Sequence, residues 1–494
     1  MPTAILLEAL PEKTVLGPIP ATVSGVAHDS RAVKPGDLFV AVPGLRQDGR
    51  RYVEDALARG AAAVVLEGPD LLEGKAVPRV LVPSSREALA RLADAYFGHP
   101  SGALTVVGIT GTNGKTTTSY LVDALLSARG QRTGLIGTVQ YRIGAEVISA
   151  GQTTPEAVEL QSLLRRMVNA GVTAVAMEVS SHGLALSRVD GIDFDVAVFT
   201  NLTQDHLDFH GTMDAYREAK RRLFVLLAAG PKPGRAVVSA DDPSGVSMVA
   251  GLPLPTLTYG IRARADVRPT RWSSGAEGIR MSVRTPAGQM DIASPLVGEH
   301  NVMNLLAAAG VGVALGIAPD AIGGALGSVG SVPGRFERVE AGQPFLVIVD
   351  YAHTPDALER TLETAQKLRA PGGRLGVVFG CGGDRDRGKR PLMGEIAARL
   401  GDHIWITSDN PRTESPEAII ADIVAGIPGG PALDRHETLP DRKSAIQGAL
   451  AWARAGDIVV IAGKGHEIYQ VIGSEVLPFD DRAQALAALA GRAT

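Results

Sequence analysis

The sequence predicts an α/β protein of three domains, and three observations lead to this fold class. The chain has 494 residues, which is enough for about three domains of ordinary size. Continuous apolar runs alternate with segments of helical periodicity, as in parallel sheets that helices cover on both faces. Polar residues directly follow several of these runs. We place a smaller N-terminal α/β domain at residues 1–100, a central parallel-sheet domain at 101–332 and a Rossmann-like domain at 333–494.

Composition excludes several classes of protein. Lys and Arg number 49 and Asp and Glu 53, so the net charge of −4 disfavours a general nucleic-acid binder. Cys381 is the one cysteine, which excludes an intramolecular disulfide and fits a reducing compartment. The longest apolar stretch, 305–318, is shorter than the ~20 residues that a membrane span needs. The N-terminus has no signal-peptide pattern. We therefore expect a cytoplasmic protein without a membrane span.

In the first domain, short β-rich runs alternate with two segments of helical periodicity. The runs are residues 22–31, 37–44, 61–67 and 79–85. Helices are predicted at Tyr52–Arg59 and Arg86–Phe97. Residues 98–102, with glycine at both ends, are typical of a linker.

The central domain alternates strands and helices. Apolar strands are predicted within residues 103–110, 173–180, 195–202 and 235–242. Helices are predicted at Lys115–Arg129, Glu156–Asn169 and Asn301–Leu315, and a more β-like insert at 256–297.

The third domain repeats the order strand, polar loop, helix. The repeats occupy residues 345–368, 374–400 and 403–426, and a last strand begins at residue 457. Open α/β sheets bind ligands at the carboxyl ends of their strands, so we expect these four loops to converge on one cleft.

The strongest local motif is Gly-Ile-Thr-Gly-Thr-Asn-Gly-Lys-Thr-Thr at residues 108–117, between a strand and a helix. Glycines let backbone N–H groups approach phosphate oxygens, and the start of the helix adds positive potential. Lys115 would reach the β- and γ-phosphates, and Thr116 would bind Mg²⁺. Ile109 stands where the general pattern has its first glycine, so this is a variant loop. The motif predicts a P-loop ATPase domain; an ordinary glycine-rich turn is the alternative.

Carboxylates and histidines follow the next two strands. Glu178 ends one of them, and Asp205, His206, Asp208 and His210 follow the other. Hard divalent cations prefer oxygen ligands, so this pattern indicates a divalent-ion site. A solvent-facing acid and helix-capping residues are the alternatives.

Two further positions have commoner structural explanations. The periodicity around Lys220 is typical of a solvated helix face. Asn301 and Asn304 share a face at the start of a helix, where an amide either contacts a base or, more commonly, caps the helix.

Charged clusters follow three successive strands of the third domain, at residues 385–390, 409–412 and 463–467. An arginine binds a carboxylate through two parallel hydrogen bonds, and Asp409 or Glu467 suits an ammonium group. The clusters together suit a zwitterionic amino acid. Ordinary surface charge is the alternative.

The order and spacing of these motifs resemble the Mur ligase family of ATP-dependent amino-acid ligases, over essentially the whole chain. The motifs are GTNGKTTT (111–118), EVSSHGL (178–184), NLTQDHLDFHG (201–211), HNVMN (300–304), PGRFE (333–337), DYAHTPDAL (350–358) and DNPR (409–412). Within the family, HDSR (28–31), QTTP (152–155) and CGGDRDRGKRP (381–391) indicate the member that adds a diamino acid to UDP-MurNAc-L-Ala-D-Glu.

The resemblance implies an activity and a set of site residues. ATP would phosphorylate the D-Glu γ-carboxylate, and the amine of the diamino acid would attack the acyl phosphate. Lys115, Glu178, His206 and Lys220 would be catalytic. ATP contacts are implied for Gly111, Thr112, Asn113, Gly114, Lys115, Thr116, Thr117, Asn301, Asp350 and His353. Mg²⁺ would be held by Thr116, Glu178, His206 and Lys220, the last modified to a carbamate, which reverses the surface interpretation of Lys220.

The resemblance also implies two further sets of contacts; we separately expect a monomer. The UDP-linked substrate would contact His28, Ser30, Leu45, Arg46, Gln47, Gln152, Thr153, Thr154, Ser180, Leu186 and Arg188; some relatives carry glutamine in place of Leu186. The diamino acid would contact Arg385, Asp409, Asn410, Pro411, Arg412, Gly463 and Glu467.

DNPR resembles relatives that add meso-diaminopimelate, and Arg412 would bind its far carboxylate. The alternatives are an L-lysine-adding homologue, a ligase like folylpolyglutamate synthase, and a nucleotide-dependent scaffold protein. The HDSR-bearing N-terminal segment argues against the second and the clustered charged loops against the third.

Overall fold

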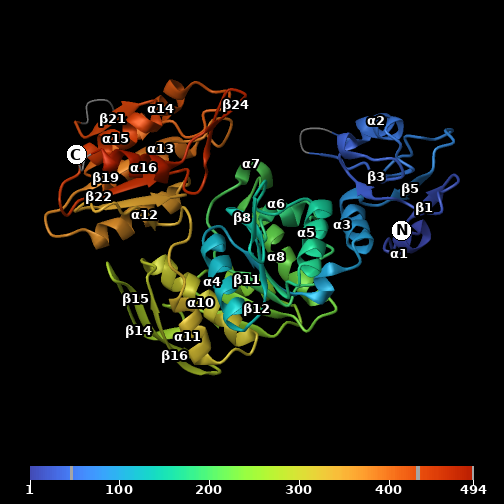
Figure 1. Cartoon of the computed structure of the whole chain (residues 1–494), viewed down its shortest axis with the longest axis horizontal. Coiled ribbons are helices and arrows are strands. Elements are labelled where there is room, and N and C mark those ends of the chain that lie inside the picture. Colours follow the sequence, from blue (N-terminus) through green and yellow to red (C-terminus); the bar gives the residue numbers. More distant parts are fainter. Residues whose placement is uncertain (45–47, 430–433, 492–494) are drawn as a thin grey trace.

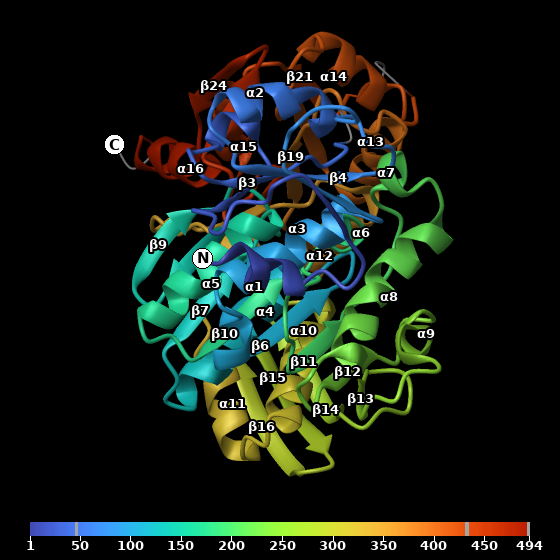
Figure 2. The same cartoon turned by 90° about the vertical axis from the view of Figure 1, so that its right-hand side faces the viewer.

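The computed structural model describes residues 1–44, 48–429 and 434–491 and has three α/β domains (Figure 1). The N-terminal domain, in blue, and the C-terminal domain, in orange and red, lie on either side of the central domain. In Figure 2 the N-terminal domain faces the viewer. Among the described residues, no helix is long and apolar enough to cross a membrane.

The N-terminal domain is a five-stranded sheet in the order β1-β5-β4-β3-β2, with β1 antiparallel to β5 and the other pairs parallel. The strands are β1 (Thr14–Leu16), β2 (Val26–Ala27), β3 (Leu38–Val40), β4 (Ala63–Glu67) and β5 (Arg79–Val82). Its helices are α1 (Thr3–Glu8), α2 (Val53–Ala58) and α3 (Ser85–Tyr96), with 3₁₀ turns η1 (Ser30–Ala32) and η2 (Gly49–Tyr52). Both predicted helices are confirmed, whereas the run at 22–31 forms the short strand β2 and the first residues of η1.

The segment between the first two domains is packed and not extended. Glycine and proline indicated a linker there, but Pro100–Ala103 forms a 3₁₀ turn, η3, in which Pro100 and Ser101 are buried. The Arg165 guanidinium donates hydrogen bonds of 2.6 Å to the carbonyls of Phe97 and Gly98. These contacts tie the segment to the central domain.

The central domain is an eight-stranded sheet in the order β13-β12-β11-β6-β10-β7-β8-β9. The strands are β6 (Thr105–Thr110), β7 (Thr133–Ile136), β8 (Gln140–Ile143), β9 (Glu146–Ser149), β10 (Ala174–Glu178), β11 (Val196–Phe199), β12 (Arg235–Ser239) and β13 (Thr256–Tyr259). The predicted parallel sheet is confirmed from β13 to β7. The antiparallel strands β8 and β9 at its edge were not anticipated, because their residues are half-exposed and lack an apolar run.

Helices cover both faces of this sheet, as continuous apolar strands require. One face packs against α4 (Lys115–Ala128), α10 (Glu299–Ala314) and α11 (Pro319–Gly327). The other packs against α5 (Ala157–Asn169), α6 (Ser181–Ala185), α8 (Met213–Ala229) and α9 (Gly245–Val249). Within β6, Val107 belongs to the first core and Val106 to the second. A one-turn helix, α7 (Leu207–His210), precedes α8.

The predicted β-like insert is confirmed in part. β14 (Arg268–Gly275), β15 (Gly278–Thr285) and β16 (Gly288–Ser294) form a separate antiparallel sheet, whereas β13 joins the main sheet.

The C-terminal domain is a six-stranded sheet in the order β17-β18-β22-β19-β20-β21, parallel except for β17. The strands are β17 (Glu337–Arg338), β18 (Leu346–Asp350), β19 (Leu375–Phe379), β20 (His403–Thr407), β21 (His436–Leu439) and β22 (Ile458–Ala462). α12 (Pro355–Leu368), α13 (Lys389–Leu400) and α14 (Pro416–Val424) cover one face, and α15 (Arg442–Trp452) and α16 (Asp481–Ala490) the other. A hairpin of β23 (Tyr469–Ile472) and β24 (Glu475–Pro478) follows β22.

Candidate active site

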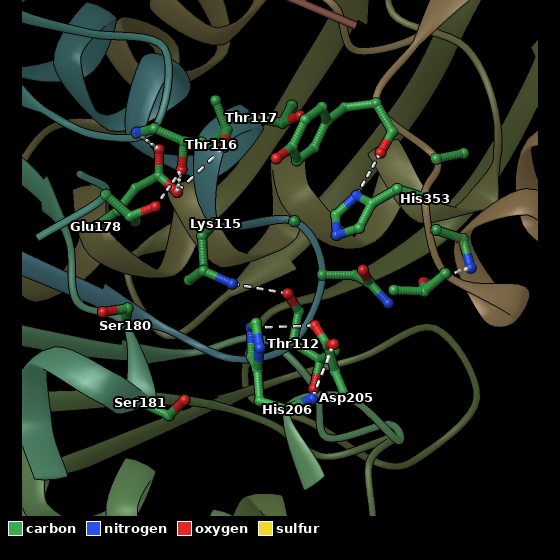
Figure 3. A pocket seen from close by; sticks show the side chains of 18 of the residues that line it. Thr112, Lys115, Thr116, Thr117, Glu178, Ser180, Ser181, Asp205, His206 and His353 are labelled. Carbon is green, nitrogen blue, oxygen red and sulfur yellow. Dashed lines mark hydrogen bonds and ion pairs between the residues drawn. The ribbon is translucent and has the colours of Figure 1, made fainter. Parts of the chain in front are cut away.

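A pocket lies where the carboxyl ends of β6, β10 and β11 meet the first residues after β18 (Figure 3). The central domain contributes the loop before α4 and the residues after β7, β10 and β11. The C-terminal domain contributes Arg335 and residues 350–354. The lining residues are Thr112–Thr117, Thr138, Thr153, Glu178, Ser180, Ser181, Asp205, His206, Tyr216, Lys220, Arg335, Asp350, Tyr351, Ala352, His353, Thr354 and Ala357.

The loop from Gly111 to Gly114 joins β6 to α4 and needs its glycines. Gly111 has φ of 144° and Gly114 has φ of 85°. A Cβ at Gly111 would lie 1.9 Å from the Thr200 hydroxyl, and one at Gly114 would lie 2.4 Å from Asn304 Oδ1. The backbone therefore takes a path that only glycine allows, and it leads into the first residues of α4, which line the pocket.

Lys115 folds back over this loop. Its Nζ donates to the carbonyl of Gly111 at 2.8 Å. It also donates to the carbonyl of Thr112 at 2.7 Å (Figure 3). Burial lowers the pKa of Lys115. A bound triphosphate would favour the charged form, because opposite charge counteracts desolvation.

An oxygen-rich cluster surrounds Glu178 at the end of β10. The Thr116 hydroxyl donates to Glu178 Oε2 at 3.1 Å, and the Thr138 hydroxyl donates to the same oxygen at 3.0 Å. Arg335 donates to Thr116 Oγ1 at 3.0 Å. Hydroxyl and carboxylate oxygens are ligands that Mg²⁺ prefers. Among the described residues no group of three or more His, Cys, Asp or Glu is placed to hold a metal. The donor set thus fits an ion shared with phosphate and water better than one held by protein alone.

His206 lies across the pocket from this cluster. Its Nε2 is 3.3 Å from Asp205 Oδ2, and its ring meets that of His182 edge-on with 4.8 Å between the ring centres. Its backbone is left-handed, with φ of 53°. Burial lowers the pKa of His206 to about 4, so the imidazole is neutral at pH 7 and able to bind a cation through nitrogen. His210, from the same sequence run, forms a hydrogen bond of 3.0 Å between its Nε2 and the Ser181 hydroxyl.

Lys220 is buried, with 1% of the residue exposed, so the solvated helix face suggested by periodicity is wrong. Its Nζ donates to the Gly111 carbonyl at 2.7 Å and lies 4.3 Å from the centre of the Tyr216 ring. Burial lowers the pKa of Lys220 well below its ordinary value. A lowered pKa increases the neutral fraction of the amine, which is the form that reacts as a nucleophile.

The predicted nucleotide contacts fall into two groups. Asp350 and His353 line the pocket together with the loop before α4. Asp350 accepts from the backbone N–H of Phe336 at 2.6 Å, and burial raises its pKa. Asn301 does not line this pocket: its amide donates to the Val297 carbonyl at 2.7 Å and accepts from Asn304 at 3.0 Å. The cap residue of α10 is Gly298 and no side chain caps the helix, so the capping interpretation of Asn301 is wrong. A contact from Asn301 to adenine stays a prediction.

The residues expected to bind the UDP-linked substrate are spread over two domains. Thr153 and Ser180 line the pocket, whereas Thr154 is buried and bonds the Glu178 carbonyl at 3.0 Å. Arg188 pairs with Glu156 at 2.5 Å and donates to Gln152 Oε1 at 2.5 Å. Leu186 is half-buried beside them. His28 and Ser30 belong to the N-terminal domain, away from this pocket. Leu45, Arg46 and Gln47 fall outside the described residues.

Three of the four loops predicted to share one cleft, those after β19, β20 and β22, contact one another. The fourth, after β18, lines the pocket described above. The Arg412 guanidinium donates to the Gly383 carbonyl at 2.8 Å and pairs with no carboxylate among the described residues. Its backbone is left-handed, with φ of 52°, and its N–H bonds the Val471 carbonyl at 3.0 Å. A non-glycine residue in this conformation is held by its surroundings, a feature common at ligand sites.

A lysine lies among the acidic residues of these loops. Lys464 is fully buried, with Nζ 3.0 Å from Glu467 Oε2 and 3.5 Å from Asp409 Oδ1. Asn410 donates to Glu467 at 2.9 Å. Pro411 is buried, Gly463 follows β22, and Arg385 is exposed.

Sequence reasoning assigned no role to several residues of the site. Arg335, Thr138 and Tyr216 line the pocket, and Lys464 lies among the acidic groups. Lys464 had a local signal, a cation in a glycine-rich loop after a strand. Arg335 belongs to the PGRFE motif (333–337), but the motif gave it no role, since its partner Thr116 lies 219 residues away.

Three family models match successive parts of the chain. "Mur ligase family, catalytic domain" matches residues 22–97, "Mur ligase middle domain" residues 109–312, and "Mur ligase, glutamate ligase domain" residues 334–465.

Curated relatives match over nearly the full length. The UDP-N-acetylmuramoyl-L-alanyl-D-glutamate–2,6-diaminopimelate ligase of Geobacillus kaustophilus is 48% identical over 94% of this chain and 94% of its own. The enzyme of the same name from Gloeobacter violaceus is 50% identical over 95% and 94%.

Solved structures share the fold. One of a UDP-N-acetylmuramoyl-L-alanyl-D-glutamate–2,6-diaminopimelate ligase is 37% identical, covers 96% of both chains and has a TM-score of 0.67. Mycobacterium tuberculosis folylpolyglutamate synthase complexed with ADP is 22% identical and covers 76% of this chain and 91% of its own, with a TM-score of 0.63.

Proposed function

The chain belongs to the Mur ligase family, and we propose that it joins meso-2,6-diaminopimelate to the D-Glu γ-carboxylate of UDP-MurNAc-L-Ala-D-Glu at the expense of ATP. The observation that carries this proposal is identity of 48–50% over nearly the whole chain to ligases of that name. The reaction makes a peptidoglycan precursor.

The chemistry needs two steps because a carboxylate is a poor electrophile. In the first, a γ-carboxylate oxygen attacks the γ-phosphorus of ATP, and the bond to ADP breaks. In the second, the amine nitrogen attacks the acyl-phosphate carbon, phosphate leaves, and the nitrogen loses a proton to solvent or a nearby base. Both steps build negative charge on oxygen atoms, so fixed positive charge at those positions lowers the barrier.

The phosphate loop supplies that charge. We assign Gly111–Thr117 to the ATP phosphates, with the Lys115 ammonium released from its two loop carbonyls to the β- and γ-phosphates. Arg335 reaches the same place from the C-terminal domain, because it already bonds Thr116. Asp350, His353 and Asn301 are the proposed nucleoside contacts.

Thr116 and Glu178 are the proposed holders of one Mg²⁺, and His206 with carbamylated Lys220 of a second. Bound Mg²⁺ would supply Lewis-acid stabilisation of phosphate charge. The buried Lys220 amine is suited to react with CO₂, because its pKa is lowered by burial. Carbamylation replaces a buried cation with an anion.

Recognition of the amino acid is assigned to the loops after β19, β20 and β22. Arg412 has no carboxylate partner among the described residues, and the far carboxylate of diaminopimelate would provide one. L-lysine lacks that group and would leave Arg412 unpaired. Leaving a charged group unpaired costs roughly 1–3 kcal/mol or more, which corresponds to discrimination of about tenfold to a few hundredfold.

The remaining assignments complete the proposal. The UDP-linked substrate would lie along His28, Ser30, Leu45, Arg46, Gln47, Gln152, Thr153, Thr154, Ser180, Leu186 and Arg188. A monomer in the cytoplasm, expected from the sequence, stays a prediction.

Phosphate release tests the proposal directly. We expect release from ATP and Mg²⁺ only when both the UDP-dipeptide and meso-diaminopimelate are present, with L-lysine at least about tenfold poorer in kcat/KM. Equal use of L-lysine would identify a lysine-adding enzyme. Turnover with a folate and glutamate would identify a folylpolyglutamate synthase. Hydrolysis without any acceptor would identify a nucleotide switch.

A further inference from the structure

Lys464 is a buried cation for which the proposed reaction provides no role. It lies after β22 in the loop of residues 463–467, and its side chain has no exposed surface. Its ammonium donates to Glu467 Oε2 at 3.0 Å and to Asn410 Oδ1 at 3.2 Å, and it lies 3.5 Å from Asp409 Oδ1. The lysine therefore lies between Asp409 and Glu467, the two carboxylates expected to suit an ammonium group of the amino acid.

The carboxylate oxygens of this cluster differ in the number of hydrogen bonds they accept. Glu467 Oε2 accepts from both Lys464 and the Asn410 amide. Asp409 Oδ1 is buried and has no hydrogen-bond partner. A buried carboxylate oxygen without a donor is destabilising unless a ligand supplies one. Asp409 Oδ1 is thus the less satisfied acceptor of the two carboxylates: it faces the Lys464 ammonium at 3.5 Å without receiving a hydrogen bond.

Charge sets the number of ammonium groups the cluster accepts. Two carboxylates and one ammonium leave a single formal negative charge. Arg412 lies in the neighbouring loop with its guanidinium unpaired by any carboxylate in the described part of the chain. The subsite therefore presents one positive charge, on Arg412, and one net negative charge, on the cluster around Lys464. These charges match the far end of an amino acid that carries one carboxylate and one ammonium.

We propose that Lys464 is a positioning residue for amino-acid selectivity: it neutralises one of the two carboxylates, so that the subsite prefers a zwitterionic end group over a cationic one. This inference rests on the proposed function and adds a determinant to it. Lys464 acts through Asp409 and Glu467, without contact with the substrate.

Removal of the Lys464 charge would make the subsite more negative by one unit. Such a site attracts the lone ammonium of L-lysine more strongly, and it repels the far carboxylate of diaminopimelate. The ratio of kcat/KM for meso-diaminopimelate to kcat/KM for L-lysine should therefore fall. Loss of a structural contact alone would weaken both amino acids together and leave the ratio unchanged.

Three substitutions separate charge from shape and hydrogen bonding. Lys464→Gln retains an amide donor but no charge, Lys464→Met retains neither, and Lys464→Arg retains the charge. We expect the selectivity ratio to fall about tenfold or more in the Gln and Met variants and to stay within about threefold of wild type in the Arg variant. The KM for ATP should remain unchanged, which verifies that each variant is folded. Lys443→Met, at an exposed lysine of the same domain, is the matched control.

The outcomes distinguish this inference from the proposed function. If wild-type protein releases no phosphate in response to diaminopimelate, the proposed function fails. If wild type does so and Lys464→Gln keeps the wild-type ratio, only the role of Lys464 is overturned. Where the Met variant does not fold, the ratio in Lys464→Gln decides.

Discussion

Lys115 is held by main-chain carbonyls and not by a carboxylate, which leaves its charge available to phosphate. Lys115→Ala should therefore lower ligation by about 10²–10³ or more, the loss typical of removing a preorganised charge donor, with the fold intact. Phosphate release at saturating ATP measures the effect, and Lys367→Ala, at an exposed lysine, is the control. Retention of most activity would contradict the assignment.

Lys220 is tested by chemical rescue. If it works as a carbamate, Lys220→Ala should lose activity, and short-chain carboxylic acids should partly restore it by supplying the missing anion. The same acids should leave Lys115→Ala inactive. Unaltered turnover of Lys220→Ala would remove it from the mechanism.

The lowered pKa of Lys220 also predicts how wild-type activity depends on CO₂. Only the neutral amine forms a carbamate, and the amine becomes protonated as pH falls through its lowered pKa. Removing dissolved CO₂ should therefore reduce turnover, and more strongly at the acidic end of the working range. Equal turnover with and without CO₂ at every pH would count against carbamylation.

Arg412 is tested by comparing two amino acids. Arg412→Ala should raise the KM for meso-diaminopimelate by about tenfold to a few hundredfold, because the far carboxylate loses its partner. The KM for ATP and the low activity with L-lysine should change little. Arg264→Ala, at an exposed arginine of the central domain, is the control. An equal loss with both amino acids would point to a structural role.

At the scale of one element, helix α4 has a glycine with positive φ at each end. Gly114, before the helix, has φ of 85° and would place a Cβ 2.4 Å from Asn304 Oδ1; Gly130, after it, has φ of 81° and open space. Gly130→Ala should cost only about 1–2 kcal/mol of backbone strain in the free energy of unfolding, with normal turnover. Gly114→Ala bears the same strain and a clash within the phosphate loop, so its KM for ATP should rise or its kcat fall by more than about tenfold.

These two variants form a matched pair. Urea unfolding measures the shared strain, and steady-state kinetics measure the loss at the loop. Comparable kinetics for both would mean that the loop tolerates a side chain at Gly114.

At the scale of the whole molecule, the start of α12 meets the phosphate loop. Asp356 Oδ2 accepts from the Asn113 amide at 2.8 Å and from the Thr203 hydroxyl at 3.4 Å. This contact joins the C-terminal domain to the ATP site. Asp356→Ala should raise the KM for ATP about two- to tenfold, the effect of one or two hydrogen bonds.

Hydrogen exchange adds a structural measurement to this prediction. Amides near the start of α12 should exchange faster in Asp356→Ala, since the docking contact is lost. Glu363→Ala, at an exposed position of the same helix, should change neither quantity. Unchanged kinetics and exchange in Asp356→Ala would show that other contacts suffice to dock the domain.

The sequence by itself determined the three-domain α/β class, the parallel strands and the glycine-rich loop between β6 and α4. These follow from local signals: apolar runs of strand length, helical periodicity, and glycines beside Lys115 at a strand–helix junction. Because open α/β sheets bind ligands at the carboxyl ends of their strands, the sequence also predicted that the loops of Asp409, Arg412 and Glu467 lie close together. The domain boundaries at 100 and 332 stay predictions.

Only the tertiary structure decided which polar side chains share a site and in what environment. Lys220 looked like a surface residue because periodicity reports the average face of a helix. In the structure it is buried, and its ammonium bonds the carbonyl of Gly111, 109 residues away. The contacts of Arg335 with Thr116 and of Asp356 with Asn113 span 219 and 243 residues. Lys464 was visible in its motif, but its position between Asp409 and Glu467 depends on how β20 and β22 lie in the sheet. Hydrogen bonds and desolvation depend on distances in space, and a local sequence pattern does not contain those distances.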